Sequence, residues 1–282
     1  MAYTQRVDRH NPSCIIFLVD QSQSMSEQIG GAAVSKAVAV ADQINGTLFE
    51  LVQRCSKSHD EPPRRYFGVS VIGYDTDSSG VPVVGSIFGG DLAGWEMAWT
   101  TDLALHPLRI EERTRVEADV QTVSYRSPIW IDPKAGFGTP MCTAFDLAGR
   151  TVKGWIEAYP NSFPPIVVNL TDGESTDGDP TVWAQRIQKL ATSDGQTLLF
   201  NIGVSTDGRQ PLMFPCDSSQ VAGRYGQTLF EMSSPLPPMM LEATARQGYS
   251  VAPGARGFGL DADMRAVMTF LNIGTSVGHL LR

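Results

Sequence analysis

The sequence has few basic residues and no long apolar segment. Over 282 residues, lysine and arginine number 22 against 30 aspartates and glutamates, a formal charge of −8. Nucleic-acid binding needs a basic surface, so this balance argues against a nucleic-acid partner. No apolar run approaches the roughly 20 residues of a membrane-spanning helix. The polar start, MAYTQRVDRHNPSC, lacks the apolar core of a secretion signal. We therefore expect a cytoplasmic protein without a membrane partner.

Cysteine is scarce, and its spacing excludes two further classes. Cys14, Cys55, Cys142 and Cys216 lie far apart and form no CxxC pair. A disulfide framework or a zinc cluster therefore has little support. We expect reduced and mostly buried thiols. Hydrophobic residues make up 42% and charged residues 18%, a composition typical of a folded globular protein.

Continuous apolar runs without alternation indicate strands that are buried on both faces of a sheet. The runs predict strands at 14–19, 66–74, 81–88, 166–170 and 197–204. Helical spacing predicts helices at 27–55, 140–158, 182–191, 237–247 and 262–273. The short turn at 76–80 predicts that the strands on either side of it pair antiparallel. Residues 89–138 show no sustained period and are interpreted as an excursion on the rim of the domain.

Strands that alternate with helices predict a doubly wound, Rossmann-like α/β fold. We expect a mostly parallel central sheet with one antiparallel edge strand and helices on both faces. The chain is predicted to be a single domain over 1–282, with its core at about 13–282 and the rim excursion at about 89–138. Such folds place their sites at the carboxyl ends of the strands. This rule directs attention to the loops after Val19 and Leu170.

Each of these two loops carries an aspartate just beyond the apolar strand, Asp20 or Asp172. The first loop adds Ser22 and Ser24, whose spacing can point two hydroxyls and a carboxylate at one place. All are hard oxygen donors, the ligands that Mg²⁺ prefers, and Mn²⁺ would also accept them. Two carboxylates neutralise such an ion without excess. The ion would then accept an outside anion at a free position.

These residues also have simpler interpretations. Asp20 and Ser22 could cap the helix that follows them. Asp172 could be a turn residue in Asp172–Gly173. Four other aspartates are predicted to be structural, as caps of the next helix or members of a hairpin turn: Asp177 and Asp179 in the first role, Asp75 and Asp77 in the second.

The segment Asp20-Gln21-Ser22-Gln23-Ser24 resembles the DxSxS signature of von Willebrand factor A (vWA) domains. That signature belongs to the metal-ion-dependent adhesion site (MIDAS), which also uses a threonine from a second loop and an aspartate from a third. Gly138-Thr139-Pro140-Met141 resembles the second element, and Leu170-Thr171-Asp172-Gly173 resembles the third. The three elements occur in the family's order. The resemblance runs from about residue 13 to the C-terminus and is looser over 89–138.

The resemblance implies that Ser22 and Ser24 bind Mg²⁺ directly. It implies that Thr139, Asp20 and Asp172 bind the ion directly or through water. A carboxylate from a partner protein would take the last coordination position, and no residue would be catalytic. The candidate partner-binding rim around the ion consists of five further residues: Trp95, Trp99, Gly138, Gly173 and Glu174.

Within the vWA family, the chain resembles cytoplasmic bacterial TerY-like proteins of tellurite resistance. The segments 138–141, 171–178 and 233–237 carry this resemblance. It implies a protein kinase or phosphatase partner in a bacterial stress-response or phage-defence system. The alternatives are a cofactor of a MoxR- or chelatase-type AAA+ ATPase, an extracellular adhesin, and a Mg²⁺-dependent phosphohydrolase of the haloacid dehalogenase type. The last has a second aspartate where this chain has Ser22, so hydrolysis would lack a base.

Overall fold

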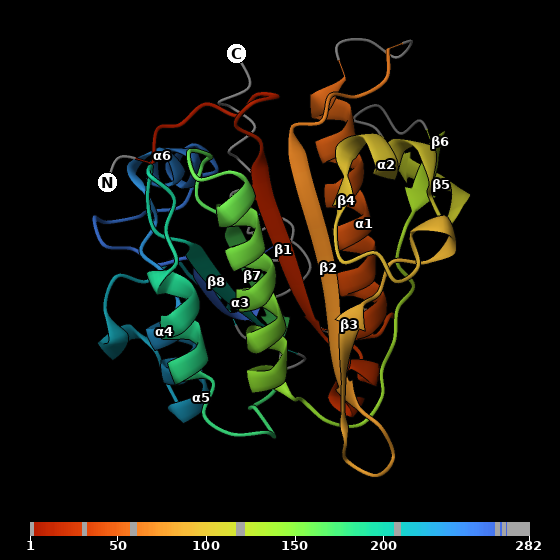
Figure 1. Ribbon diagram of the computed structural model, residues 1–282. Helices are drawn as coiled ribbons and strands as arrows, with labels where there is room; N and C mark the ends of the chain where they lie inside the picture. The colour runs from red at the N-terminus through yellow and green to blue at the C-terminus, as the bar shows by residue number, and fades with distance from the viewer. Residues whose placement is uncertain are drawn as a thin grey trace.

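A mostly parallel sheet forms the centre of the computed structural model (Figure 1). The structure describes residues 3–29, 33–56, 61–116, 122–205, 210–262, 266 and 269. Within these residues the strand order is β3-β2-β1-β7-β8-β10-β9, and the five strands between the two edges run parallel to one another. The seven strands are β1 (Ser13–Asp20), β2 (Phe67–Thr76), β3 (Pro82–Ser86), β7 (Ile166–Thr171), β8 (Leu198–Val204), β9 (Leu212–Met213) and β10 (Phe258–Ala262).

The predicted fold class is confirmed, including the antiparallel edge strand. β3 pairs antiparallel with β2 through a tight turn, in which Asp77 accepts hydrogen bonds from the backbone nitrogens of Ser79 and Val81. The structure adds two short antiparallel strands. β9 pairs with β10 at the other edge, and β4 (Ala98–Trp99) pairs with the start of β2.

β1 lies between β2 and β7, and its position explains its unbroken apolar sequence. All eight of its residues are buried, because parallel neighbours flank it and helices cover both faces. Ile15 and Phe17 pack into the core cluster on one face, whereas Ile16 and Leu18 pack into the cluster on the other. The polar residues therefore begin where the strand ends, at Asp20.

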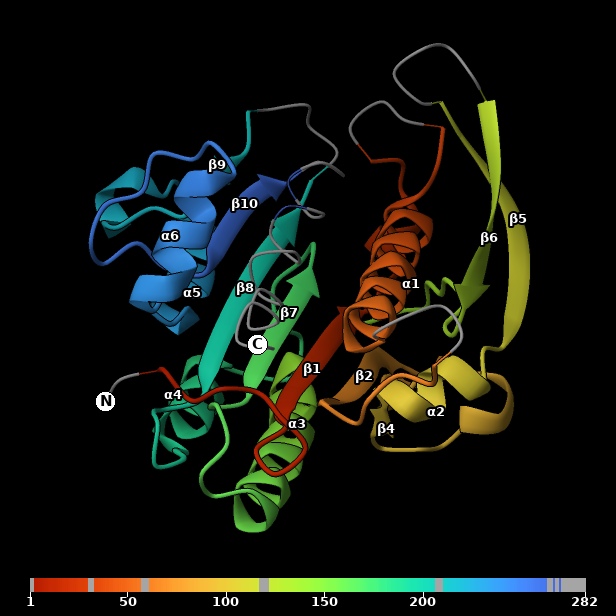
Figure 2. The same cartoon turned by 90° about the horizontal axis from the view of Figure 1, so that it is seen from above.

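Helices cover both faces of this sheet. Seen from above, α1 and α3 lie on opposite sides of it (Figure 2). Residues of α1 and α6 pack in one core cluster, and residues of α3, α4 and α5 pack in the other. The helices are α1 (Lys36–Cys55), α2 (Thr100–Leu105), α3 (Met141–Ala158), α4 (Thr181–Lys189), α5 (Arg224–Met232) and α6 (Pro238–Arg246).

The described part of the excursion at 89–138 packs against α1. After β4 and α2, a separate antiparallel ribbon forms from β5 (Arg109–Val116) and β6 (Thr122–Ile129). Its Arg113 makes an ion pair with Asp42 of α1, with Nη2 and Oδ1 2.7 Å apart. Just beyond β6, the buried side chain of Asn45 bonds to the backbone of Trp130 and Ile131. These contacts order a segment whose sequence shows no period. The single-domain organisation stays a prediction.

Two helix predictions differ from the structure. α1 begins at Lys36, not at residue 27, and Ser35 caps it by accepting a hydrogen bond from the nitrogen of Val38. α5 was not predicted because Gly226 lowers the helix propensity of its first turn. The lack of a side chain at Gly226 lets Leu260 and Val221 pack close, since a Cβ atom would lie 2.9 Å from an atom of each. The predicted helix at 262–273 lies almost entirely outside the described residues.

The four cysteines are free thiols: Cys14, Cys55 and Cys142 are buried, and Cys216 is exposed.

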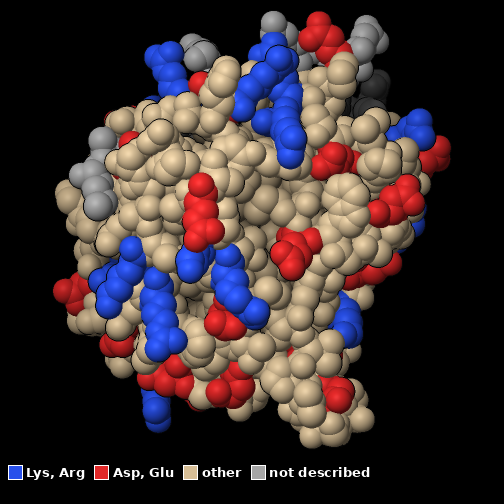
Figure 3. Space-filling view, in the orientation of Figure 1, with Lys and Arg blue, Asp and Glu red and all other residues tan. Residues whose placement is uncertain are grey.

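On the face drawn in Figure 3, acidic and basic side chains are interspersed over a mostly uncharged surface. No helix among the described residues is long and apolar enough to cross a bilayer.

Candidate metal centre

The carboxyl ends of β1 and β7 bring the two predicted loops together. The parallel register pairs Val19 with Leu170, so that Asp20, one residue after Val19, and Asp172, two residues after Leu170, lie at the same edge of the sheet. The loop after β1 turns into a short 3₁₀ helix, Gln23–Ser26. This turn places the Ser22 and Ser24 hydroxyl oxygens 3.1 Å apart. The sheet register and one tight turn therefore assemble four of the five predicted ligands.

Asp172 receives both serine hydroxyls on one carboxylate oxygen. Ser24 donates to its Oδ1 at 2.7 Å, and Ser22 lies 3.5 Å from the same atom. The Asp172 side chain has no exposed surface. Its role is thus not that of a simple turn residue, since its hydrogen bonds cross from one loop to the other.

Asp20 lies at the end of β1 with none of its surface exposed. Its Oδ1 accepts a 2.8 Å hydrogen bond from the nitrogen of Ser22, and its Oδ2 accepts one of 2.7 Å from the hydroxyl of Thr171. Burial raises the pKa of this carboxyl to about 6, although both hydrogen bonds act in the opposite direction. A cation beside Asp20 would offset the cost of this buried charge.

The capping interpretation of this loop is not supported. Ser22 is the residue before the 3₁₀ helix, but its side chain makes no capping hydrogen bond. The following long helix is capped by Ser35 instead. The hydroxyls of Ser22 and Ser24 instead bond to Asp172 and to each other.

Thr139 lies just before α3 and is nearly buried. Its backbone is fixed by two hydrogen bonds to Thr176, of 3.1 and 2.9 Å. Its Oγ1 lies 3.8 Å from the position that a Cβ atom on Gly173 would take. Among the described residues this hydroxyl has no hydrogen-bond partner in the structure. The second element of the motif thus lies against the loop of Asp172, and its hydroxyl oxygen is free among the described residues.

Lys36 is a component of this site that the sequence did not reveal. Its Nζ lies 2.8 Å from Oδ2 of Asp172 and 2.9 Å from Oε2 of Glu27. Burial acts to lower the pKa of this ammonium, but the two carboxylates outweigh burial, and the pKa is raised. The sequence placed Lys36 within a long helix, which gave no reason to aim it at the loop after β7.

Asp75 holds the segment that leads to Thr139. The predicted turn role is wrong for this residue, because Asp75 belongs to β2 and its Oδ1 accepts a 2.6 Å hydrogen bond from the nitrogen of Phe137. Lys134 approaches its Oδ2 at 3.4 Å. A Cβ atom on Gly136 would overlap the same carboxylate. Only glycine therefore lets the chain pass here on its way to α3.

Asp177 and Asp179 are structural, as predicted, but they serve different helices. Asp179 accepts hydrogen bonds from the nitrogen and hydroxyl of Thr181 at the start of α4. Asp177 turns to α3 instead, and its two oxygens accept from the nitrogens of Cys142 and Thr143, each at 2.9 Å. The loop after β7 thereby ties the start of α3, and with it Thr139, to the site.

The oxygens that converge here fit a small divalent cation. Two buried carboxylates and three hydroxyls are hard donors, and the two carboxylates balance the charge of Mg²⁺ or Mn²⁺. The described residues contain no cluster of three or more His, Cys, Asp or Glu side chains. The candidate ligands comprise only two such side chains, Asp20 and Asp172, and their other three members are hydroxyls. Its one unexpected feature is the ammonium of Lys36.

Sequence comparisons leave the family open, whereas the fold has relatives among solved structures. No family model and no curated protein matches the sequence. The pilus adhesin SpaC from Lactobacillus rhamnosus GG matches with a TM-score of 0.53 and 12% identity, over 98% of this chain and 31% of SpaC. The ArnB paralog VWA2 from Sulfolobus acidocaldarius matches with a TM-score of 0.36 and 13% identity, over 68% of this chain and 35% of VWA2. At such identity the likeness to SpaC shows the fold alone, and this chain spans about a third of SpaC's length.

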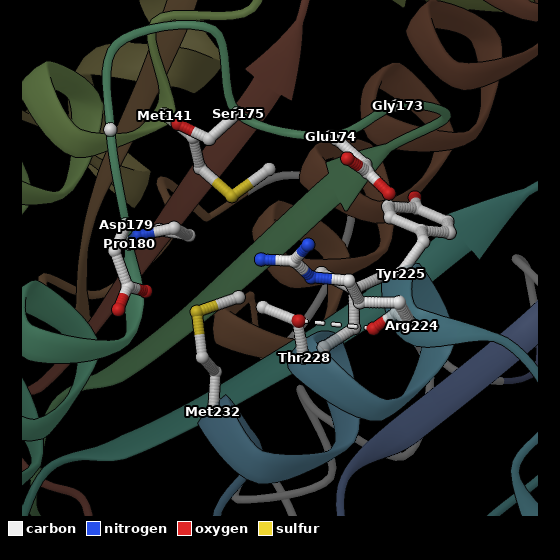
Figure 4. Close-up of a pocket in the computed structure, with 12 residues that line it drawn as sticks. Met141, Gly173, Glu174, Ser175, Asp179, Pro180, Arg224, Tyr225, Thr228 and Met232 are labelled. Carbon is white, nitrogen blue, oxygen red and sulfur yellow. Dashed lines mark hydrogen bonds between the residues drawn. The ribbon is translucent and has the colours of Figure 1, made fainter.

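A pocket of about 260 Å³ opens beside the candidate ligands. Gly173 and Glu174 form part of its wall, together with Met141 at the start of α3 and Met232 at the end of α5. Figure 4 shows the guanidinium group of Arg224 extending from α5 into this space. The pocket lining thus combines apolar side chains with one basic group, Arg224, and two acidic ones, Glu174 and Asp179.

The two tryptophans of the predicted rim, Trp95 and Trp99, lie just before and in β4, whereas Gly173 and Glu174 of the same rim lie beside the candidate ligands. Trp99 pairs with Gly68 near the start of β2, whereas Asp20 pairs with Tyr74 near the end of that strand. Trp99 thus lies at the opposite end of the sheet from the candidate ligands, where its ring packs 5.4 Å from Trp155. Trp95 is 44% exposed in the segment just before β4. The structure thus places Trp99 away from the candidate ligands, and Trp95 lies in the segment that leads into the same short strand.

Proposed function

We propose that this chain is a vWA-type adaptor, a non-catalytic protein that binds a partner through a divalent cation. The cation is Mg²⁺, with Mn²⁺ as a substitute, held by Asp20, Ser22, Ser24, Thr139 and Asp172. The partner presents an aspartate or glutamate, whose carboxylate completes the coordination. The convergence of both serine hydroxyls on the buried Asp172 carries this proposal.

Charge balance supports a bridge to a carboxylate. A divalent ion between two aspartates leaves no net charge to repel an acidic side chain. The bound ion would act as a single strong and directional contact, and the surrounding surface would supply the rest of the interface. Glu174 and Arg224, at the neighbouring pocket, offer groups of both signs to the residues that flank the partner's carboxylate.

The partner is proposed to be a protein kinase or a phosphatase in a bacterial stress-response or phage-defence system, with a cytoplasmic location. This part of the proposal rests on the resemblance of the motif segments to TerY-like proteins. The alternative partner is an AAA+ ATPase of the MoxR or chelatase type. The catalytic alternative has less support, because Ser22 stands where a haloacid dehalogenase phosphotransferase has its second aspartate.

The test is a pull-down from the native host with the tagged protein in Mg²⁺ and in EDTA. We expect a partner that is retained only in Mg²⁺ and that is lost with Asp20→Asn. Replacement of single acidic residues of that partner by alanine should identify one whose loss mimics EDTA. A partner that binds equally in EDTA and to Asp20→Asn would overturn the metal bridge.

A further inference from the structure

The ammonium of Lys36 lies among the groups that would hold the metal. Besides its ion pairs with Asp172 and Glu27, its Nζ lies 3.5 Å from the backbone oxygen of Ser24. Only 5% of the lysine side chain is exposed. One cationic group thus contacts two loops of the candidate site from the first residue of α1.

Lysine is rarely buried unless its charge is paired. Here the pairing uses Oδ2 of Asp172, while the hydroxyl of Ser24 uses Oδ1. Both oxygens of this carboxylate are therefore engaged by groups of the chain itself. A divalent ion near Asp172 would face a positive charge held within hydrogen-bond distance of the same carboxylate, and the two cations would repel each other.

We propose that Lys36 is a tethered counter-ion, and that a divalent cation binds by displacing its ammonium from Asp172. This inference rests on the proposed function, because it requires the ion to bind at these residues. Without metal, Lys36 neutralises the buried carboxylate and keeps the loops after β1 and β7 together. The lysine therefore lowers the affinity of the site for metal.

The contacts of Lys36 provide a place for the displaced group. Glu27 is its second partner, and 60% of the Glu27 side chain is exposed. Rotation about the flexible lysine stem takes Nζ away from Asp172 while it stays close to Glu27. Metal binding thus moves a positive charge from the interior toward the surface on which a partner's carboxylate would dock.

Acylation of lysines tests the displacement directly in the wild-type protein. The protein is treated with an acetylating reagent in EDTA and in saturating Mg²⁺, and modification of each lysine is measured by peptide mass spectrometry. Lys153, whose side chain is 69% exposed, is the internal reference. We expect Lys36 to be protected in EDTA and several-fold more reactive in Mg²⁺, with Lys153 unchanged. Equal reactivity of Lys36 in both conditions, with Mg²⁺ shown to be bound, overturns the displacement.

Lys36→Met tests the effect on affinity, because methionine keeps much of the stem and removes the charge. We expect isothermal titration calorimetry to show Mg²⁺ binding that is tighter by on the order of tenfold. In EDTA the variant should melt at a lower temperature than wild type, and Mg²⁺ should raise its melting temperature by more. Lys36→Arg, which keeps the charge, should not tighten binding, and Lys153→Met should match wild type.

The outcomes separate this inference from the proposed function. If neither wild type nor Lys36→Met binds Mg²⁺ or Mn²⁺, the metal site itself is wrong. If wild type binds the ion and Lys36→Met binds it equally or more weakly, the counter-ion role alone is overturned. If Lys36→Met does not fold, the acylation experiment on the wild-type protein decides.

Discussion

The hydroxyl of Ser24 donates a 2.7 Å hydrogen bond to Oδ1 of Asp172, across 148 positions of sequence. This contact joins the loop after β1 to the loop after β7 at the carboxyl edge of the sheet. It also orients both groups toward the same small volume.

Ser24→Ala should weaken Mg²⁺ binding by about 10- to 100-fold, the range found when a ligand or its supporting hydrogen bond is removed. Isothermal titration calorimetry measures the loss. The matched control is Ser26→Ala, because the Ser26 hydroxyl lies in the same short helix and bonds to the backbone oxygen of Gln23 instead. Equal affinities for the two variants would show that Ser24 is not a ligand.

Asp177→Ala should lower the free energy of unfolding by about 1 to 2 kcal/mol, because it removes the cap of α3. Burial acts to raise the pKa of Asp177, but hydrogen bonds from Cys142 and Thr143 outweigh it, and the pKa is lowered. A carboxyl with a lowered folded-state pKa stabilises fully above its unfolded value, here 3.8. The difference between variant and wild type should therefore be constant near neutral pH and shrink as the pH falls below that value. Thermal melts from pH 7 to pH 3 measure it, and a difference that grows in acid would contradict this assignment.

Gly136→Ala should destabilise the protein by about 1 to 3 kcal/mol, the usual cost of overpacking, because its Cβ atom would overlap the carboxylate of Asp75. Gly154→Ala is the control, since the structure leaves open space around that helical position. There alanine should stabilise by about 0.5 to 1 kcal/mol, because it has the higher helix propensity. Urea unfolding of both variants checks these opposite signs. A Gly136→Ala variant as stable as wild type would show that this segment runs elsewhere.

Trp99→Ala should reduce stability by about 2 to 4 kcal/mol and leave Mg²⁺ affinity unchanged. The ring packs against Trp155 and Tyr159, and the Arg65 guanidinium lies 3.9 Å from its centroid. All of these contacts lie at the end of the sheet away from Asp20. Denaturation and calorimetry on the same variant separate the two effects. If Trp99→Ala folds but binds Mg²⁺ more weakly than wild type, Trp99 contributes to the metal site and this assignment is wrong.

The sequence predicted the buried strands well, because a parallel strand covered on both faces leaves little room for polar residues. The run CIIFLV and the run IVVNL correspond to β1 and β7, and their ends locate Asp20 and Asp172. Since carboxyl ends of adjacent parallel strands meet at one edge, the site's position also followed from the pattern. The change from apolar to polar residues at the two strand ends was thus sufficient to locate the candidate site.

The contacts that the sequence did not predict are those between segments that lie far apart in the chain. Lys36 reaches Asp172 only because α1 begins nine residues later than its apolar spacing suggested. Asp177 looked like a cap for the helix next in sequence, yet it caps α3, which lies before it in the chain. Both side chains are polar and could bond to several partners, and only the tertiary structure determines which partner is close enough. The position of Trp99 depends in the same way on the pairing of β4 with β2.

Mg²⁺ titration of the wild-type protein and Asp20→Asn by calorimetry tests the central claim most directly. The substitution keeps the size of the side chain and removes one of the two buried charges at the site. The account predicts one Mg²⁺ site in the wild-type protein and no measurable binding to Asp20→Asn, with both proteins folded in EDTA. Mg²⁺ binding of equal affinity to both proteins, or to neither, would contradict it.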